Sequence, residues 1–232
     1  MENTFFTTLL VTFKLALYTT CILLILGIFI AYFLSNFFTE KNSFISKLKP
    51  LVETIVTLPI VLPPSVIGFY ILIVFSPYSA IGSFLKEHFD FTFAFTFGGI
   101  VMASVFFSLP FMVNPIYNAI NNLPVSLKEA SFSLGKGAFE TFIKVLLPCV
   151  KNNILSACAV TFAHTIGEFG IVLMVGGNIP NKTRVASIAI YDEFESLNFS
   201  LAHKYSIILF VTSSLMLLTV YVLNKKLKRS SL

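Results

Sequence analysis

Long apolar stretches alternate with short polar segments along the chain, and this pattern predicts membrane-spanning helices. About 20 apolar residues are needed to cross the hydrocarbon core of a bilayer. Five stretches reach that length: residues 13–35, 54–75, 97–119, 153–175 and 205–223. The apolar part of the first stretch is too long for a signal peptide and no small-residue cleavage site follows it, so we expect a retained span.

Two segments depart from a plain pattern of helices and loops. Pro59, Pro63 and Pro64 fall near the start of the second predicted span, where each removes a backbone donor. They predict either a kink whose freed carbonyls are satisfied by neighbouring helices or a bend that lines a pathway. Residues 176–204 combine turn signals with an apolar run too short to cross, so we expect a partly buried outer loop or a re-entrant segment.

The composition agrees with lipid as the main solvent of this chain. Of the 232 residues, 56% are hydrophobic and 12% are charged, and the mean hydropathy is +0.87. The three cysteines form no CxxC pair, so neither a disulfide framework nor a zinc site is indicated. The predicted fold class is an all-α integral membrane protein with one transmembrane domain over residues 1–232.

Basic residues concentrate on alternate polar segments, and this asymmetry predicts the orientation in the membrane. One set of segments holds eleven bases: Lys41, Lys47, Lys49, Lys128, Lys136, Lys144, Lys151, Lys225, Lys226, Lys228 and Arg229. The other set holds four: Lys86, Lys182, Arg184 and Lys204. Because cytoplasmic loops carry the excess of bases, we expect the N-terminus outside and the C-terminus inside. The formal net charge of +5 thus reflects topology and does not indicate a nucleic-acid partner.

Residues 121–151 form a predicted cytoplasmic segment that is too polar to enter lipid and too long for a simple connector. Pro124 marks the start of a helix that Ser126 can cap, and apolar or small residues recur at helical spacing up to residue 138. Glycines at 135 and 137 loosen this helix, and a second helical stretch over 139–147 ends before Pro148. An amphipathic helix lying on the membrane surface is the alternative interpretation.

This segment resembles the cytoplasmic signature of the permeases of ATP-binding-cassette importers. That signature is E-A-A, three residues, G, nine residues, an aliphatic residue, any residue, then L-P. The chain has Glu129-Ala130-Ser131, Gly135, Val145 and Leu147-Pro148 at this spacing, and Ser131 is the one departure. The resemblance implies a type I importer fold whose short helix docks into an ATPase subunit. It assigns ATPase coupling to Ser126, Leu127, Glu129, Ala130, Ser131, Leu134, Gly135, Val145, Leu147 and Pro148.

The same resemblance implies the partners of the chain. They are a second copy of this subunit, two ATPase subunits and an external oxyanion-binding protein, in a multi-pass arrangement in the lipid of a bacterial cytoplasmic membrane. The run from Gly135 to Gly137 lacks the features of a phosphate-binding loop, so we expect no cofactor on this chain and assign ATP and Mg²⁺ to the ATPase.

Two other function classes fit the sequence less well. An enzyme is not indicated, because none of the three histidines has a partner at ligand spacing. A non-transporting scaffold would explain the spans but not the complete coupling signature at residues 129–148.

Further stretches resemble the molybdate permeases in particular. They are residues 58–65 with Gly68, 91–95, 167–170, 177–184 and 189–191. Sulfate permeases share the Gly-Glu-Phe-Gly run and a similar Gly-Asn-Ile turn, so tungstate and sulfate stay as alternative substrates. The resemblance implies pathway or structural roles for Pro59, Pro63, Pro64, Gly167, Glu168, Gly170, Asn178, Lys182, Thr183 and Arg184.

Few polar groups are available to hold an anion within the membrane. A permease that grips a dianion needs buried bases or converging helix N-termini at mid-membrane. Lys14 is the one base within a predicted span, and it lies near the outer end. We therefore expect a weak, mostly apolar passage, with affinity supplied by the delivery protein.

Glu168 is an acid in an otherwise apolar run, with His164 one turn earlier. An ionisable group at such depth is functional by default. The alternative is a position near the outer surface, bonded to loop donors such as Lys182 or Arg184. Because a negative charge would repel an anion, we expect Glu168 to anchor the outer loop without touching the substrate.

Overall fold

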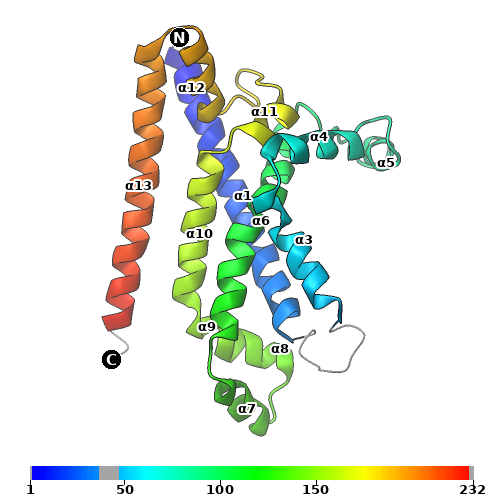
Figure 1. Ribbon diagram of the computed structural model, residues 1–232, viewed down its shortest axis with the longest axis vertical. Helices are drawn as coiled ribbons and strands as arrows, with labels where there is room; N and C mark the ends of the chain where they lie inside the picture. Colours follow the sequence, from blue (N-terminus) through cyan, green and yellow to red (C-terminus); the bar gives the residue numbers. More distant parts are fainter. Residues whose placement is uncertain (1, 37–46, 230–232) are drawn as a thin grey trace.

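The computed structural model describes residues 2–36 and 47–229, and the side chains of residues 4–36 and 47–224. Within these residues the chain is helical and contains no strand (Figure 1). The elements are α1 (Glu2–Asn36), α3 (Lys49–Val61), α4 (Pro64–Val74), α5 (Ala80–Phe89), α6 (Phe97–Asn121), α7 (Val125–Ser133), α8 (Ala138–Thr141), the π-helix η1 (Phe142–Leu146), α9 (Leu147–Cys149), α10 (Lys151–Ile166), α11 (Gly170–Gly176), α12 (Ala186–Glu195) and α13 (Phe199–Arg229). The all-α class is confirmed.

Helices α1, α6 and α10 pack against one another and form the centre of the bundle (Figure 1). Their contacts bury Leu15, Ile100, Met112 and Ile116 completely. Gly27 lets α1 approach α6 closely, since a Cβ atom there would lie 2.6 Å from the Met112 side chain. Helix α13 packs against α10 and α12. Only 6% of its most apolar stretch is buried within the described bundle, compared with 61% of the corresponding stretch of α6. Its remaining apolar surface therefore faces outward.

Five spans are compatible with the structure, although two of them are broken. Three helices are long and apolar enough to cross a membrane by themselves: Thr4–Asn36, Phe97–Asn121 and Phe199–Asn224. The first and last of these helices begin earlier than the sequence predicted, at Thr4 instead of residue 13 and at Phe199 instead of residue 205. Two bent helix pairs bring the total to five if each pair counts as one span. The protein is thus a multi-pass membrane protein.

The second predicted span is divided by a bend of 115° between α3 and α4. Leu62 takes an extended conformation with ψ 140°, as expected for a residue before proline, and Pro63 then precedes α4. Pro59 lies inside α3 and is buried. The predicted kink or bend at these prolines is therefore confirmed, because consecutive prolines at 63 and 64 disfavour the α conformation at the residue before each of them.

The fourth predicted span also ends early. Helix α10 stops at Ile166, and α11 starts at Gly170 after three residues outside any helix. The prediction of one span over 153–175 was wrong at its outer end. Gly167, with its low helix propensity, ends the helix as its C-cap. At its other end α10 follows the α8–α9 segment after a bend of 74°.

The two ends of the bundle carry different elements (Figure 1). Helices α7, α8 and α9 lie at one end with the last turns of α13, and we name this the α7 end. The start of α1, α11 and α12 lie at the opposite end, the α12 end. The segments that hold the eleven bases lie at the α7 end, except that Lys41 falls outside the described residues. Which end faces the cytoplasm stays a prediction from charge.

Candidate functional site

The first candidate site is the exposed helix α7. It starts after Pro124, whose carbonyl accepts the Leu127 N–H at 3.1 Å. No side chain among the described residues caps its N-terminus, so the prediction that Ser126 caps the helix was wrong. Ser126 is instead the second helical residue and is exposed. Proline at the N-cap already sets the extended backbone there with φ −56° and ψ 133°.

Gly135 ends α7 with a left-handed turn. Its φ is +75°, its N–H donates to the Phe132 carbonyl, and the Lys136 N–H donates to the Ser131 carbonyl at 3.2 Å. This pair of bonds is a Schellman motif, which requires a residue with positive φ. The predicted helix up to residue 138 therefore stops at Ser133. Gly137 has an ordinary φ of −72° and precedes α8.

The signature residues of α7 divide between its two faces. Glu129 and Ala130 are exposed, next to the exposed apolar side chains of Phe132 and Leu134. Ser131 is buried, and its hydroxyl shares a 2.8 Å hydrogen bond with the Thr141 hydroxyl of α8. The departure from alanine at this position thus adds a polar link between α7 and α8. Leu127 is half-buried.

The stretch after α7 continues through Pro148 without ending before it. It passes through the π-helix η1, where the Leu147 N–H donates to the Phe142 carbonyl, and α9 ends at Cys149. Pro148 is the second residue of α9 and directly follows the π-helix, so the prediction of an end before Pro148 was wrong. Val145 and Leu147 are half-buried.

Three side chains fix this stretch to the bundle. Phe142, Leu146 and Val150 are each 1% exposed within the main core cluster. The ring of Tyr32 on α1 lies 4.9 Å from the Phe142 ring and 5.6 Å from the Phe139 ring. These contacts join α8 and η1 to α1.

Two ionisable side chains at the α7 end, Lys128 and Glu140, have shifted pKa values. Burial lowers the pKa of Lys128 on α7, and the nearby Lys49 ammonium lowers it further. Glu140 forms ion pairs with Lys144 at 2.9 Å and Lys136 at 3.9 Å, and the Lys144 hydrogen bond lowers the pKa of this exposed carboxyl. These pairs are exposed, so they contribute little to stability.

The second candidate region is the folded cap at the α12 end. Arg184 pairs with Asp192 at 3.3 Å and Glu193 at 3.5 Å, and Asn178 Nδ2 donates to Asp192 at 2.7 Å. The alternative that Glu168 bonds to Arg184 or Lys182 is therefore wrong: Arg184 is engaged by the acids of α12, and Lys182 is exposed.

Thr183 holds the turn of this cap together. Its side chain is 0% exposed, and its hydroxyl donates to the Gly176 carbonyl at 2.6 Å while it accepts the Ile179 N–H at 3.0 Å. The Thr12 hydroxyl of α1 accepts the Ala186 N–H at 2.8 Å. The expected outer segment over 176–204 is thus partly buried, but it contains α12 and the first turns of α13.

Glu168 lies in the link between α10 and α11 and is 5% exposed. Its carbonyl accepts the Ser187 hydroxyl of α12 at 2.6 Å, so its backbone is what contacts the cap. The hydroxyl of Ser104 on α6 lies near its carboxyl group. Among the described residues, neither carboxyl oxygen nor the Ser104 hydroxyl makes a hydrogen bond of good geometry.

A groove separates the start of α4 from the α10–α11 link. It measures about 770 Å³ and is lined by Pro64, Ser65, Phe107, His164, Glu168 and Gly170. A Cβ atom on Gly170 would lie 3.0 Å from the Pro64 Cβ, and one on Gly68 would lie 2.8 Å from the Met174 Cβ. These two glycines therefore allow α4 to lie directly on α11, and we name the space beside them the α4 groove.

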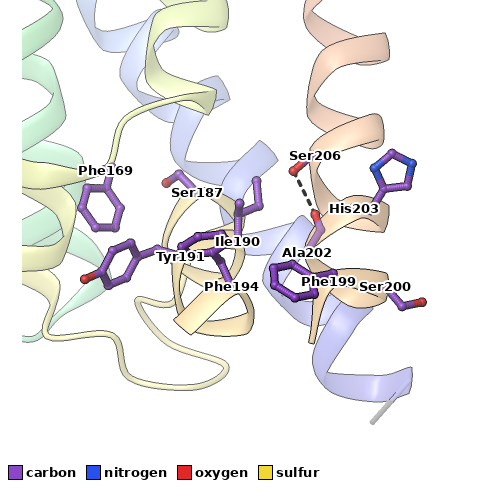
Figure 2. Close-up of a pocket in the computed structure, with 10 residues that line it drawn as sticks. All are labelled: Phe169, Ser187, Ile190, Tyr191, Phe194, Phe199, Ser200, Ala202, His203 and Ser206. Carbon is purple, nitrogen blue, oxygen red and sulfur yellow. Dashed lines mark hydrogen bonds between the residues drawn. The ribbon is translucent and has the colours of Figure 1, made fainter. Parts of the chain in front are cut away.

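A second groove of about 780 Å³ lies between α12 and α13. Figure 2 shows its wall of aromatic rings, which includes Tyr191, Phe194 and Phe199, and the hydrogen bond of Ser206 to the Ala202 carbonyl. The Ser187 hydroxyl is also used within the fold, and Ser200 and His203 are further polar side chains of the lining.

Sequence reasoning identified most of the α7 signature but missed its internal partners. The missed residues are Thr141, which bonds Ser131, and Ser187 and Thr12, which hold α12. Their partners lie 10, 19 and 174 residues away, beyond the reach of a local sequence pattern. Asp192 and Glu193 were visible as acids near Arg184, and this opposite charge was the signal that could have paired them.

The family model and the similar proteins agree that this chain is related to transport-system permeases. The family model described as "Binding-protein-dependent transport system inner membrane component" matches residues 23–229. The molybdenum transport system permease protein ModB of Azotobacter vinelandii is 40% identical over 210 residues, which cover 90% of each chain. A probable sulfate transport system permease protein, cysT of Helicosporidium sp. subsp. Simulium jonesii, is 33% identical over 92% of this chain and 76% of that protein.

A solved structure shares the fold. It is the crystal structure of a bacterial ABC transporter involved in the import of the acidic polysaccharide alginate. The TM-score is 0.79 at 16% sequence identity, and the match covers 97% of this chain and 80% of that chain. At this identity the likeness concerns the fold alone.

Proposed function

Since the chain belongs to the family of inner membrane components of binding-protein-dependent transport systems, we propose that it is the permease subunit that translocates molybdate in an ATP-driven importer. The chain is a transport permease subunit and not itself an enzyme. The observation that carries the proposal is the 40% identity over nine tenths of the chain to a molybdenum permease. The exposed α7 with its Schellman turn at Gly135 supports it.

The assembly in this proposal contains two copies of the chain, two ATPase subunits and an external oxyanion-binding protein. The chain binds no nucleotide, and ATP with Mg²⁺ is held by the ATPase. The importer lies in a bacterial cytoplasmic membrane, with the α7 end in the cytoplasm and lipid around the outward face of α13. The presence of ATPase and binding-protein partners follows from the family.

Helix α7 is the element that contacts the ATPase in this account. Its exposed face offers Glu129, Ala130 and the apolar side chains of Phe132 and Leu134. Ser131 ties α7 to α8, and Phe142 ties the following π-helix to the bundle. Movement of the ATPase thus reaches α1 through packed side chains, because a close-packed interior transmits displacement.

Molybdate is preferred over the alternatives on sequence grounds. The permeases named for molybdenum and for sulfate are both similar to this chain, at 40% and 33% identity for the two compared above. Sulfate or tungstate is therefore the alternative substrate within the same importer class. Molybdate, tungstate and sulfate are all tetrahedral dianions, so their discrimination belongs mainly to the delivery protein.

The test is uptake by cells that lack molybdate import and express this chain with its ATPase and binding protein. We expect uptake of radiolabelled molybdate to return, and a hundredfold excess of sulfate to leave it nearly unchanged. Restored sulfate uptake without molybdate uptake would keep the importer class and overturn the substrate. No restored uptake of either anion, with all three proteins present, would overturn the proposed function.

A further inference from the structure

Helix α5 stands apart from the bundle at the end of the bent α3–α4 pair. Its main helix contact is with α4. Figure 1 shows α4 and α5 to the side of the bundle near the α12 end, both lying across its long axis. The bend of 115° before α4 produces this direction. Since the spans follow the long axis, α5 lies roughly parallel to the membrane plane.

Both ends of α5 are closed by local hydrogen bonds. The Ser79 hydroxyl accepts the Gly82 N–H at 2.9 Å and thereby caps the N-terminus. At the other end Asp90 takes a left-handed conformation with φ +47°, and its N–H donates to the Lys86 carbonyl at 3.1 Å. The helix is therefore completed by its own sequence and does not need the bundle to satisfy its ends.

The side chains of α5 form an apolar strip and a polar strip on opposite sides, since each residue turns the helix by about 100°. The apolar strip is Ile81, Phe84, Leu85 and Phe89, and the polar strip is Ser83, Lys86 and Glu87. Ile81, Phe84 and Phe89 are 51%, 53% and 68% exposed. No part of the chain that the structure describes covers these three side chains.

His88 lies within the apolar strip but has a partner inside the helix. Its ring stacks on Phe84 with centroids 4.3 Å apart, and its Nδ1 lies 3.1 Å from the Phe84 carbonyl oxygen. In the neutral ring with its proton on Nδ1, this N–H is satisfied locally. On the polar strip the charges of Lys86 and Glu87 cancel, so attraction to a charged surface is not what this helix offers.

We infer that α5 is an interfacial helix whose apolar strip lies at the boundary between headgroups and acyl chains in the leaflet at the α12 end. An amphipathic helix parallel to the membrane plane buries its apolar face there. A stable protein interface buries about 800 Å² on each partner, which three side chains of one short helix do not supply by themselves. The lipid contact anchors the far end of α4, because residues 75–79 are all that separate α4 from α5.

A single tryptophan tests this inference, because the chain has none of its own. Phe84→Trp places the probe on the apolar strip, and Lys86→Trp places it about 200° around the same helix, on the polar strip. Each permease–ATPase complex is reconstituted in phosphatidylcholine nanodiscs, and the emission of the wild-type complex is subtracted. Two quenchers are compared: iodide in the water, and phosphatidylcholine brominated near the carbonyl end of its acyl chains.

We expect the brominated lipid to lower the Phe84→Trp emission at least twofold and iodide to have little effect on it, with the reverse for Lys86→Trp. Quenching of Phe84→Trp by iodide but not by lipid would place the strip in water and overturn the inference. Quenching by neither would mean that a second copy or another protein covers the strip, and this result would overturn it as well.

Ile81→Trp repeats the measurement on the apolar strip if Phe84→Trp does not assemble with the ATPase. Phe210→Trp is the reference for a side chain deep in lipid, since Phe210 is 74% exposed within the last span. With bromine moved to the end of the acyl chains, we expect quenching to rise for Phe210→Trp and to fall for Ile81→Trp. A rise for both would place α5 inside the hydrocarbon core and contradict an interfacial helix.

Discussion

Single residues determine how the segments at both ends of the bundle turn. Gly135 adopts the positive φ that ends α7, and Thr183 satisfies two backbone groups inside the cap of α12. Gly135 has open space around it, so its constraint is conformational, whereas Thr183 is fully buried, so its constraint is a pair of hydrogen bonds. These two causes predict different mutational effects.

Gly135→Ala is expected to destabilise the turn after α7 by about 1 kcal/mol, because a side chain is disfavoured at φ +75°. Gly137→Ala is the matched control, since that glycine is equally open and has φ −72°. Thermal unfolding of the purified permease–ATPase complex, with the fraction of ATPase retained, provides the comparison. Equal behaviour of both variants would contradict the Schellman assignment.

Thr183→Val is expected to lower the free energy of unfolding by roughly 2 kcal/mol or more, because it leaves the Gly176 carbonyl and the Ile179 N–H without their partner. Thr212→Val serves as the control, since the Thr212 hydroxyl bonds only to carbonyls of its own helix. Thermal melting in detergent measures both. A melting temperature that stays at the wild-type value for Thr183→Val would contradict the role given to this hydroxyl.

At the scale of elements, the apolar pattern predicted the positions of the spans but not their breaks. Composition and length located five apolar stretches, because each one is long enough to cross lipid. The prolines predicted the bend in the second span. The stop at Ile166 was missed, since hydropathy does not distinguish one straight helix from two short helices that meet at an angle. The short helices α5 and α12 were missed for another reason: they lie between the predicted spans and are too short to be detected as spans.

The α7 region was predicted better than the α12 end. Its signature depends on local spacing, and Gly135 is read directly from the sequence. Ser126 was misassigned as a cap because Pro124, two residues earlier, already sets the helix start. The partners of Glu168 could not be predicted, since the competition between Glu168 and the acids of α12 for Arg184 depends on tertiary packing.

Phe142→Ala is expected to destabilise the packing of η1 on the bundle by about 3 kcal/mol, because Phe142 is 1% exposed and its loss leaves a cavity. Phe139→Ala should cost far less, since Phe139 is 60% exposed one turn earlier. The two melting temperatures in detergent make the comparison. If both variants melt together, the π-helix is not fixed to the bundle as described.

At the scale of the whole molecule, the two ends carry different tasks. The α7 end presents exposed residues, which we propose for the ATPase contact, and the α12 end carries a cap held by Arg184 and Thr183. The opposite positions of these ends along the bundle match a protein that spans the membrane (Figure 1). The assignment of each end to a compartment follows from the distribution of bases.

Orientation is tested by labelling single cysteines with an impermeant maleimide in a variant whose three native cysteines are replaced by alanine. We expect Tyr78→Cys to react in spheroplasts, and Leu134→Cys to react only after lysis. Tyr78 lies between α4 and α5 and is 99% exposed, whereas Leu134 directly follows α7 and is 78% exposed. The experiment omits the ATPase, which would cover Leu134. The reverse pattern would place the α7 end outside.

The central claim is that residues 121–151 couple this permease to its ATPase. The most direct test combines Glu129→Ala with Gly135→Pro, since proline excludes the φ of +75° and removes the N–H that bonds Phe132. ATPase co-purification and molybdate uptake are measured together in cells where the variant is shown to insert. We predict that the variant loses the ATPase and restores no uptake. Uptake at the wild-type rate would contradict the account.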